Sequence, residues 1–255
     1  MAVKARAVLH AVVHHGRVAR PFTIILIVVA LSAGVDPLLA QGGQPSVTRI
    51  VQAATSTARH GAYYLPSNYD ARVLPLMVGF HGTGGTGSLM VRRLQTVAER
   101  EGFIVLAPDS VSVAGVWSVG QRSDEVTEDY RHVMDCVHEV MRSPGVRVDA
   151  ARVLAVGFSV GASVAPYIAT HESQFTDFAM LHGHITPASF GPLRPRAWVS
   201  AGDQDRVRTV EYMRSVADHL TRAGFPSVEL RVFKSDHRLG DEELAALVVW
   251  WLGKR

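Results

Sequence analysis

Two patterns of apolar residues alternate along most of the chain. Between helical segments lie continuous apolar runs, typical of strands covered on both faces, at residues 76–80, 103–107, 153–156 and 178–181, and two further strands are expected at residues 197–201 and 228–233. Apolar residues recur at helical spacing in residues 88–101, 126–141, 209–222 and 242–252. A further strand, within residues 58–65, is expected at an edge of the sheet. This alternation predicts an α/β protein with a mostly parallel central sheet and helices on both faces.

The apolar run at residues 153–156 leads into the most informative stretch of the chain. It meets a G-x-S-x-G motif at residues 157–161 and then an apolar helical pattern, which predicts a strand, a sharp turn and a helix with Ser159 at the tip. Such a turn strains the backbone of the serine, and a Cβ atom two residues before or after it would crowd the neighbouring strand and helix. We therefore expect Ser159 to project its hydroxyl outward as a nucleophile.

The loops after two later strands carry the partners that this serine would need. A serine hydroxyl requires a base within hydrogen-bond reach and an acid that orients the base. In an open parallel sheet such groups follow the carboxyl ends of the strands. His237, one of 12 histidines, occupies the loop after residues 228–233 and is the expected base. Asp203 and Asp205 both follow residues 197–201, and either could reach the imidazole.

A glycine-rich loop, residues 81–87, directly follows the run at residues 76–80. Acyl transfer needs two backbone N–H groups aimed at the oxygen that becomes negatively charged. We expect the amide of Val160, directly after the nucleophile, to be one of them. The other is expected at Thr83, where the surrounding glycines let the backbone approach a substrate closely. The alternative, a plain flexible turn, fits less well because the loop begins where a strand ends.

Neither a metal nor a cofactor is expected. His182 and His184 form an H-x-H pair, but no third ligand is spaced to join them. Cys136 is the single cysteine, so an intrachain disulfide is excluded, and its place in a helical pattern indicates a packing residue.

The first 40 residues differ from the rest of the chain. A basic start precedes an uncharged run at residues 22–35, and Ala40 is a plausible cleavage point, which together indicate a secretory signal peptide. An uncleaved anchor is the alternative, since the apolar segment is close to spanning length. We expect a linker at residues 41–57 and one catalytic domain at residues 58–255, facing outward from the cell in either case.

The charge balance of the remaining chain gives no indication of a nucleic-acid partner. The net charge of +3 comes largely from residues 1–40, and without them the chain holds 22 basic and 22 acidic residues. The expected partner is a small or extended ester, and a membrane only if the N-terminal segment is retained.

Residues 63–252 resemble the α/β-hydrolase superfamily, in which the triad runs Ser, Asp, His along the chain. Three stretches are similar to secreted esterases related to polyhydroxybutyrate depolymerases and feruloyl esterases, namely residues 81–85, residues 108–110 with 117–118, and residues 148–153. Residues 202–207 and 236–237 are more similar to the phospholipase/carboxylesterase and dienelactone hydrolase group. The glycine-to-aspartate spacing of that group favours Asp205 over Asp203 as the acid.

The resemblance implies a secreted serine hydrolase that cleaves carboxylic esters through an acyl-enzyme. It departs from the depolymerases at Arg238, where those enzymes carry tryptophan, and at Asp236, where glycine is common. An acyltransferase or thioesterase with the same triad is one alternative, and a non-catalytic binding protein on this fold is another. Only about 45 residues separate Ser159 from Asp205, so no large lid domain is expected and the cleft should be open.

Overall fold

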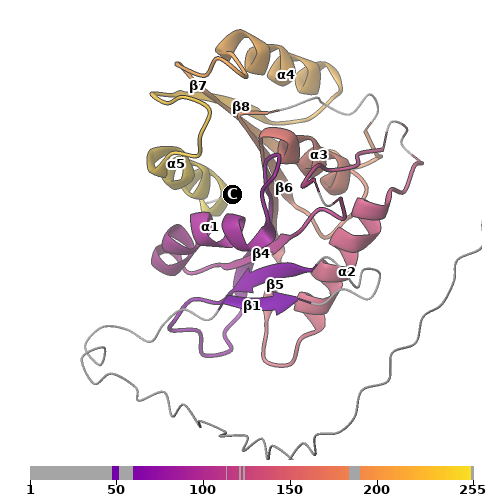
Figure 1. Ribbon diagram of the computed structural model, residues 1–255, viewed down its shortest axis with the longest axis vertical. Coiled ribbons are helices and arrows are strands. Elements are labelled where there is room, and N and C mark those ends of the chain that lie inside the picture. Colours follow the sequence, from indigo (N-terminus) through magenta and orange to yellow (C-terminus); the bar gives the residue numbers. More distant parts are fainter. Residues whose placement is uncertain are drawn as a thin grey trace, which may run out of the picture. The chain divides into compact units, whose positions relative to one another are not determined.

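The computed structural model describes residues 48–51, 60–112, 114–120, 122, 124–183 and 190–253. Within them, eight strands form a single sheet (Figure 1). The strands are β1 (Thr48–Val51), β2 (Gly61–Tyr64), β3 (Leu74–Phe80), β4 (Ile104–Pro108), β5 (Val148–Phe158), β6 (Asp177–Leu181), β7 (Arg196–Gly202) and β8 (Val228–Phe233). The helices are α1 (Gly87–Glu101), α2 (Glu128–Arg142), α3 (Val164–Ala169), α4 (Val210–Arg222) and α5 (Asp241–Leu252), with a short 3₁₀ helix, η2 (Ser159–Ser163).

The sheet has the order β1-β2-β4-β3-β5-β6-β7-β8. From β4 to β8 every neighbouring pair is parallel, whereas β1 and β2 form an antiparallel end of the sheet. The central strand β3 is buried along its whole length and pairs with β4 and β5. The prediction of a mostly parallel sheet is therefore confirmed, and the carboxyl ends of β3 and of β5 to β8 lie along one edge.

The predicted linker at residues 41–57 needs correction, because residues 48–51 form strand β1. Thr48 pairs with Tyr64 and Val51 with Gly61, so β1 extends the sheet beyond β2. Three of the four residues of β1 are β-branched, which favours a strand, but four residues are too few for a pattern to show in the sequence. As a consequence β1, and not the strand expected within residues 58–65, forms this edge.

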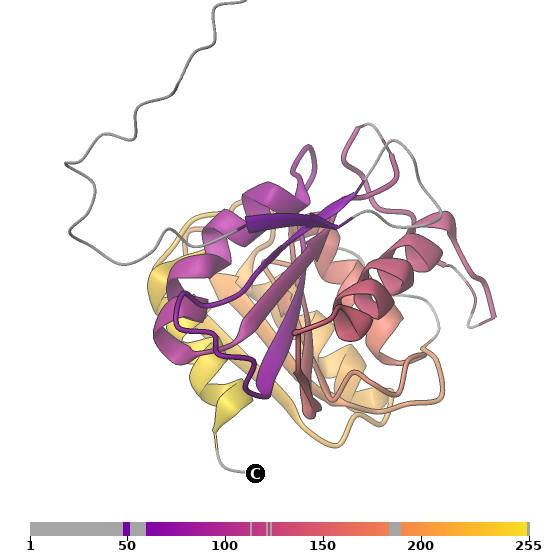
Figure 2. The same ribbon diagram turned by 90° about the horizontal axis from the view of Figure 1, so that it is seen from below.

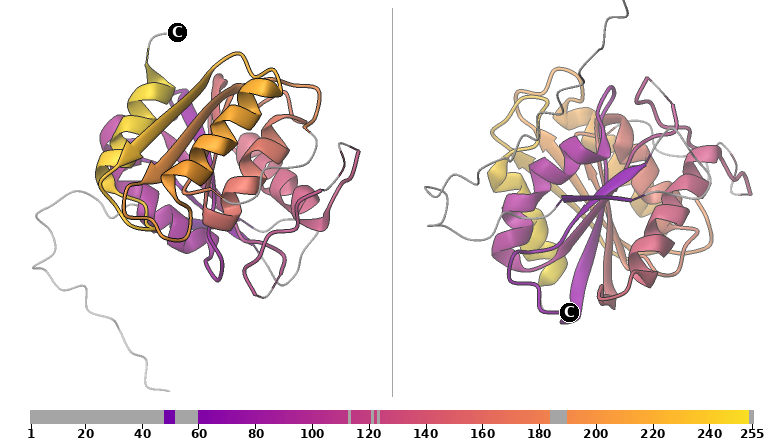
Figure 3. Two further views of the ribbon diagram at one scale, coloured as in Figure 1. Left: turned by 90° about the horizontal axis from the view of Figure 1, so that it is seen from above. Right: turned by 60° about the horizontal axis from the view of Figure 1, so that its bottom comes forward.

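Helices cover both faces of the sheet (Figures 2 and 3). Helices α1 and α5 pack against one face, where Leu94 and Trp251 belong to the same buried apolar cluster. Helices α2, α3 and α4 pack against the other face, in a second cluster that includes Val137 and Met213. A three-layer arrangement of this kind explains why β3, β4 and β6 are apolar and buried along their whole length, whereas the edge strand β8 is partly exposed.

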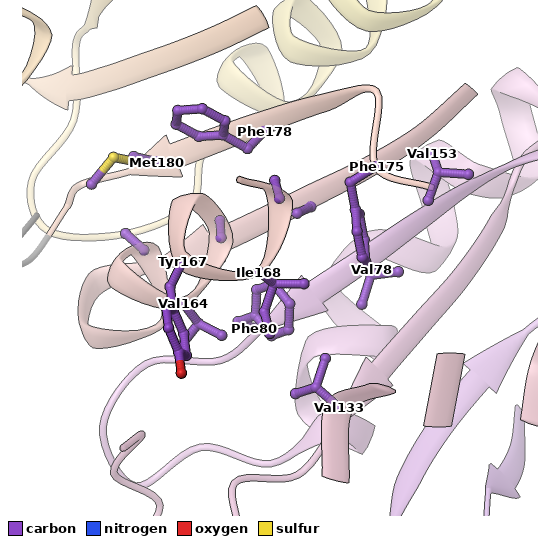
Figure 4. Packing of buried hydrophobic residues seen from close by; sticks show 14 of the residues in the cluster. Val78, Phe80, Val133, Val153, Val164, Tyr167, Ile168, Phe175, Phe178 and Met180 are labelled. Atoms are coloured by element: carbon purple, nitrogen blue, oxygen red, sulfur yellow. The ribbon is translucent and has the colours of Figure 1, made fainter. Parts of the chain in front are cut away.

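The core beneath α3 shows how closely the second face is packed (Figure 4). Phe80 of β3 and Tyr167 and Ile168 of α3 are at most 2% exposed and belong to one cluster. Cys136 of α2 is also fully buried there, and burial raises the pKa of its thiol to about 12, so the thiol remains protonated. These contacts agree with the expectation that Cys136 is a packing residue.

The expected helix after Ser159 takes a different form in the structure. Residues Ser159–Ser163 form the 3₁₀ helix η2, and the α-helix that follows, α3, has only six residues. The other predicted helices and strands are present, with ends shifted by a few residues. The largest shift is in β5, which begins at Val148.

The predicted signal peptide or anchor, residues 1–40, lies outside the described residues. None of the helices that the structure describes is both long enough and apolar enough to cross a membrane.

Candidate active site

Four consecutive strands of the sheet each deliver one polar residue to the same edge. Ser159 follows β5, His182 follows β6, Asp205 lies in the loop after β7, and His237 lies in the loop after β8. Because β5 to β8 are parallel neighbours, their carboxyl ends lie side by side. Residues separated by up to 78 positions in the chain therefore meet in one cluster.

Ser159 occupies a strained turn, as the G-x-S-x-G motif predicts. Its φ angle is +55°, in the left-handed region that few non-glycine residues adopt. A Cβ atom on Gly157 would lie 2.0 Å from the carbonyl oxygen of Gly161, and one on Gly161 would lie 2.3 Å from that of Phe80. The two glycines are therefore required by close backbone contacts, and they let the turn hold Ser159 at the end of β5.

The hydroxyl of Ser159 lies in line with an imidazole and a carboxylate. His237 Nε2 is 3.0 Å from Ser159 Oγ, and His237 Nδ1 is 2.8 Å from Asp205 Oδ2. Since a carboxylate only accepts hydrogen bonds, Nδ1 carries the proton and Nε2 can accept the proton of the serine. Asp205, and not the exposed Asp203, is thus the acidic residue that contacts the base in the structure.

The carboxylate of Asp205 is buried but remains ionised. Burial alone would raise its pKa, yet hydrogen bonds lower the pKa to about 2. The backbone amides of Val207 and Arg208 each donate to Oδ1 at 2.8 Å, while His182 and His237 both bond to Oδ2. The carboxylate is therefore fixed in one orientation, with one oxygen directed at the two imidazoles.

The glycine-rich loop after β3 borders the same site. No hydrogen bond among the described residues uses the amide of Thr83, whereas the amides of Gly84 and Gly85 bond to Gly115 and Gly82. Val160 lies in the first turn of η2, where a backbone N–H has no partner within the helix. Both expected oxyanion donors thus lie in segments that flank Ser159. With so short a helix after it, Val160 can act only through its own N–H and gains little from a helix dipole.

His81 supports this loop from beneath. The Ser110 amide donates to His81 Nε2 at 3.2 Å, so the ring donates from Nδ1 to the carbonyl of Gly82, 2.8 Å away. The indole of Trp117 donates to the carbonyl of His81 at 2.8 Å. Sequence similarity drew attention to residues 108–110 and 117–118, and the structure gives the physical reason: these segments support the loop that carries Thr83.

Sequence reasoning missed the contact of His182 with Asp205. The sequence indicates for His182 only a possible metal-ligand pair with His184, which lies outside the described residues. In the structure its ring is fully buried and contacts Asp205 at 2.8 Å and Glu243 of α5 at 3.3 Å. Its position directly after a strand, on the same edge as the triad, is the signal that could have revealed it.

Three of these residues, His182, Asp205 and His237, are of the types that bind metal ions. Their ligand atoms lie within 4.8 Å of one another, and among the described residues no other three histidine, cysteine or acidic side chains lie so close together. Hydrogen bonds between the imidazoles and the carboxylate account for their proximity. A metal would have to displace a proton from both Nδ1 atoms and break the contacts that orient His237.

A hollow of about 370 Å³ opens beside the serine, between α1 and the loop after β8. Its walls are mainly apolar and include Leu89, Met90, Phe158 and Leu239. The guanidinium of Arg93 bonds to the carbonyl of Leu239 at 2.6 Å and so ties the two walls together. A second hollow of about 850 Å³, more polar, also borders His237.

We expect Gly157→Ala to destabilise the fold, because its Cβ would overlap the carbonyl of Gly161. The overlap should cost about 3 kcal/mol or more, measured as the free energy of unfolding in urea. Gly240→Ala is the matched control, since its Cβ meets nothing closer than 4.0 Å and its φ is −86°. The free energy of unfolding of that variant should stay within about 1 kcal/mol of that of the parent. Equal losses in the two variants would contradict the steric explanation.

Asp205→Asn should slow the reaction of Ser159 with a fluorophosphonate probe, by roughly 10³-fold or more, because asparagine cannot hold the imidazole in the same tautomer. Asp203→Asn is the control and should react at the parental rate, since Asp203 is exposed and, among the described residues, the hydrogen bond of His237 Nδ1 goes to Asp205. The reverse ranking would identify Asp203 as the acid.

Comparison with known proteins gives matches at the level of structure. No protein-family model and no curated protein sequence matches the chain. Esterase PE8 is 18% identical with a TM-score of 0.58, over 75% of this chain and 97% of that one. A Bacillus cereus carboxylesterase is 17% identical with a TM-score of 0.57, over 77% and 95%. An acylaminoacyl peptidase of Pyrococcus horikoshii is 12% identical with a TM-score of 0.60, over 82% of this chain but 41% of its own length.

At these identities the likeness concerns the fold. It agrees with the strand order, with the strained serine after β5, and with the order of serine, aspartate and histidine along the chain. The chain has the α/β-hydrolase fold, without a large additional domain among its described residues.

Proposed function

We propose that the protein is a serine hydrolase that cleaves carboxylic esters. The observation that carries the proposal is the unbroken line of hydrogen bonds from Ser159 through His237 to Asp205, at 3.0 and 2.8 Å. Solved structures of similar fold include an esterase and a carboxylesterase, which supports ester chemistry over a purely binding role.

The residues would act in the following way. His237 takes the proton of Ser159 as the hydroxyl attacks the ester carbonyl, and Asp205 stabilises the imidazolium that forms. The amides of Thr83 and Val160 stabilise the oxyanion of the tetrahedral intermediate. His237 then gives its proton to the departing alcohol and activates a water molecule, which releases the acid and restores Ser159.

The apolar hollow would hold the acyl group. Its volume, about 370 Å³, is near the lower end of the roughly 300–1,000 Å³ typical of small-molecule sites. Side chains such as Leu89, Met90 and Phe158 would favour an aliphatic acyl chain of a few carbons. The second hollow beside His237 leaves room for a substrate that extends beyond the ester bond.

We also propose that the enzyme acts outside the cytoplasm. The support is the basic and then apolar composition of residues 1–40, and mass spectrometry of the mature N-terminus would separate a cleaved signal peptide from a retained anchor.

Ester hydrolysis is tested with p-nitrophenyl esters from acetate to long acyl chains. The 41–255 chain should turn over the short esters, with kcat/KM falling for long chains as the hollow fills. In Ser159→Ala, kcat/KM should fall on the order of 10⁴-fold or more, because the nucleophile is gone. Equal amounts of product from the two proteins would rule out the proposed triad. Addition of alcohol or thiol acceptors would reveal an acyltransferase.

Leu89→Trp should narrow the acyl site. Leu89 is 49% exposed at the mouth of the apolar hollow, so the larger ring should obstruct it without disturbing the core. We expect kcat/KM for the hexanoate ester to fall about tenfold more than for acetate. Val249→Trp is the control, on an α5 residue that is 70% exposed and does not line the hollow. An equal loss for both esters in Leu89→Trp would place the acyl chain elsewhere.

A further inference from the structure

His182 is a fully buried imidazole that the proposed mechanism does not use. Its ring lies between two carboxylates, with Nδ1 2.8 Å from Asp205 Oδ2 and Nε2 3.3 Å from Glu243 Oε2. Its φ of +49° is a second left-handed backbone conformation at this edge of the sheet, after that of Ser159. A strained backbone and a buried polar ring are both costly, which points to a specific role.

The hydrogen bonds around His182 determine its charge. Asp205 accepts two backbone N–H bonds at Oδ1, so it has no proton to donate there. Glu243 accepts from the hydroxyl of Ser200 at Oε1 and from the amide of Gly240 at Oε2. When both carboxyl groups accept, each ring nitrogen of His182 donates, and a ring that donates twice is an imidazolium.

The structure gives this ring two further neighbours. Besides Asp205 and Glu243, the ring faces the imidazole of His237 from the loop after β8, at a centroid distance of 5.7 Å, and the ring of Phe158 from β5, at 5.8 Å. Burial by itself would lower the pKa of His182, but the hydrogen bonds and charges of Glu243 and then Asp205 outweigh it and raise the pKa.

We propose that His182 is a positioning residue: as a buried imidazolium held by Glu243, it fixes the Asp205 carboxylate in the orientation that aligns His237 with Ser159. The proposal rests on the proposed function of these three residues. It adds a second imidazole and a second carboxylate behind the triad, so the bonds run from Ser159 through His237, Asp205 and His182 to Glu243.

The position of the hydrogen bond between His182 and Asp205 explains its expected effect on the reaction. The two imidazoles share one oxygen, Oδ2, while the backbone amides of Val207 and Arg208 hold the other. Without a donor at His182, Oδ2 has one side-chain partner and the carboxylate can rotate away from His237. Such a rotation would lower the rate of the chemical step more than it affects substrate binding, because it misaligns His237 with Ser159.

The kinetic test compares His182→Asn with His182→Leu. Asparagine tolerates a left-handed backbone and keeps a donor near the position of Nδ1, whereas leucine has a similar volume and no donor. His182→Leu should lower kcat about 100-fold, with KM within about threefold of the parent. His182→Asn should lower kcat only about tenfold. Equal losses in the two variants, or kcat within about twofold of the parent in both, would overturn the proposal.

The charge of His182 is tested without any turnover. In ¹⁵N-histidine-labelled Ser159→Ala, both ring nitrogens of His182 should keep the imidazolium chemical shift from about pH 5 to 8. Glu243→Gln in the same background removes one of the two anions, so deprotonation should move to lower pH. A neutral His182 throughout that range would overturn the proposal, even in a protein whose parent hydrolyses esters.

The two tests also separate this proposal from the proposed function. A parent enzyme that hydrolyses no ester would count against the esterase proposal, while the chemical shifts would still decide the charge of His182. If His182→Leu does not fold, as judged by its thermal unfolding, His182→Asn and Glu243→Gln remain. Parental kcat in both of these, together with a neutral His182, would overturn the positioning role.

Discussion

The carboxylate of Asp205 is the group on which the rest of the site depends. It accepts four hydrogen bonds, two from the backbone of its own loop and two from imidazoles that follow other strands. These bonds keep a buried group ionised, which burial alone would oppose. They also join β6, β7 and β8 at their carboxyl ends, so the same interactions serve the stability of this edge and the orientation of His237.

The sheet makes this convergence possible. Parallel neighbours from β5 to β8 bring four loops to one edge, and a close backbone contact on each side of Ser159 holds the serine at the end of β5. The loop after β3 reaches the same edge, and the ring of His81 and the indole of Trp117 hold it there. The polar groups of the candidate site are thus positioned by packed elements of the core, which keeps their geometry within narrow limits.

Ser159 lies between an apolar and a polar part of the site. On the side of α1 the hollow is apolar, whereas the triad and its supporting residues lie among hydrogen-bond donors and acceptors. An ester with an aliphatic acyl group and a polar carbonyl matches this division. The imidazolium assigned to His182 fits it as well, because its positive charge lies against the buried carboxylate of Asp205.

The sequence by itself determined the order of the strands and helices after β1, the strained serine, and the histidine in the loop after the last strand. These features are local: apolar runs, glycines two residues either side of Ser159, and the placement of His237 in a loop between a strand and a helix can all be read from neighbouring residues. Tertiary structure decided the rest. Only the folded chain brings Asp205 rather than Asp203 to the imidazole, adds β1 to the sheet, and places His182 between Asp205 and Glu243. These contacts join residues 10 to 61 positions apart, or depend on which side of a turn a side chain faces, and no periodic pattern encodes either.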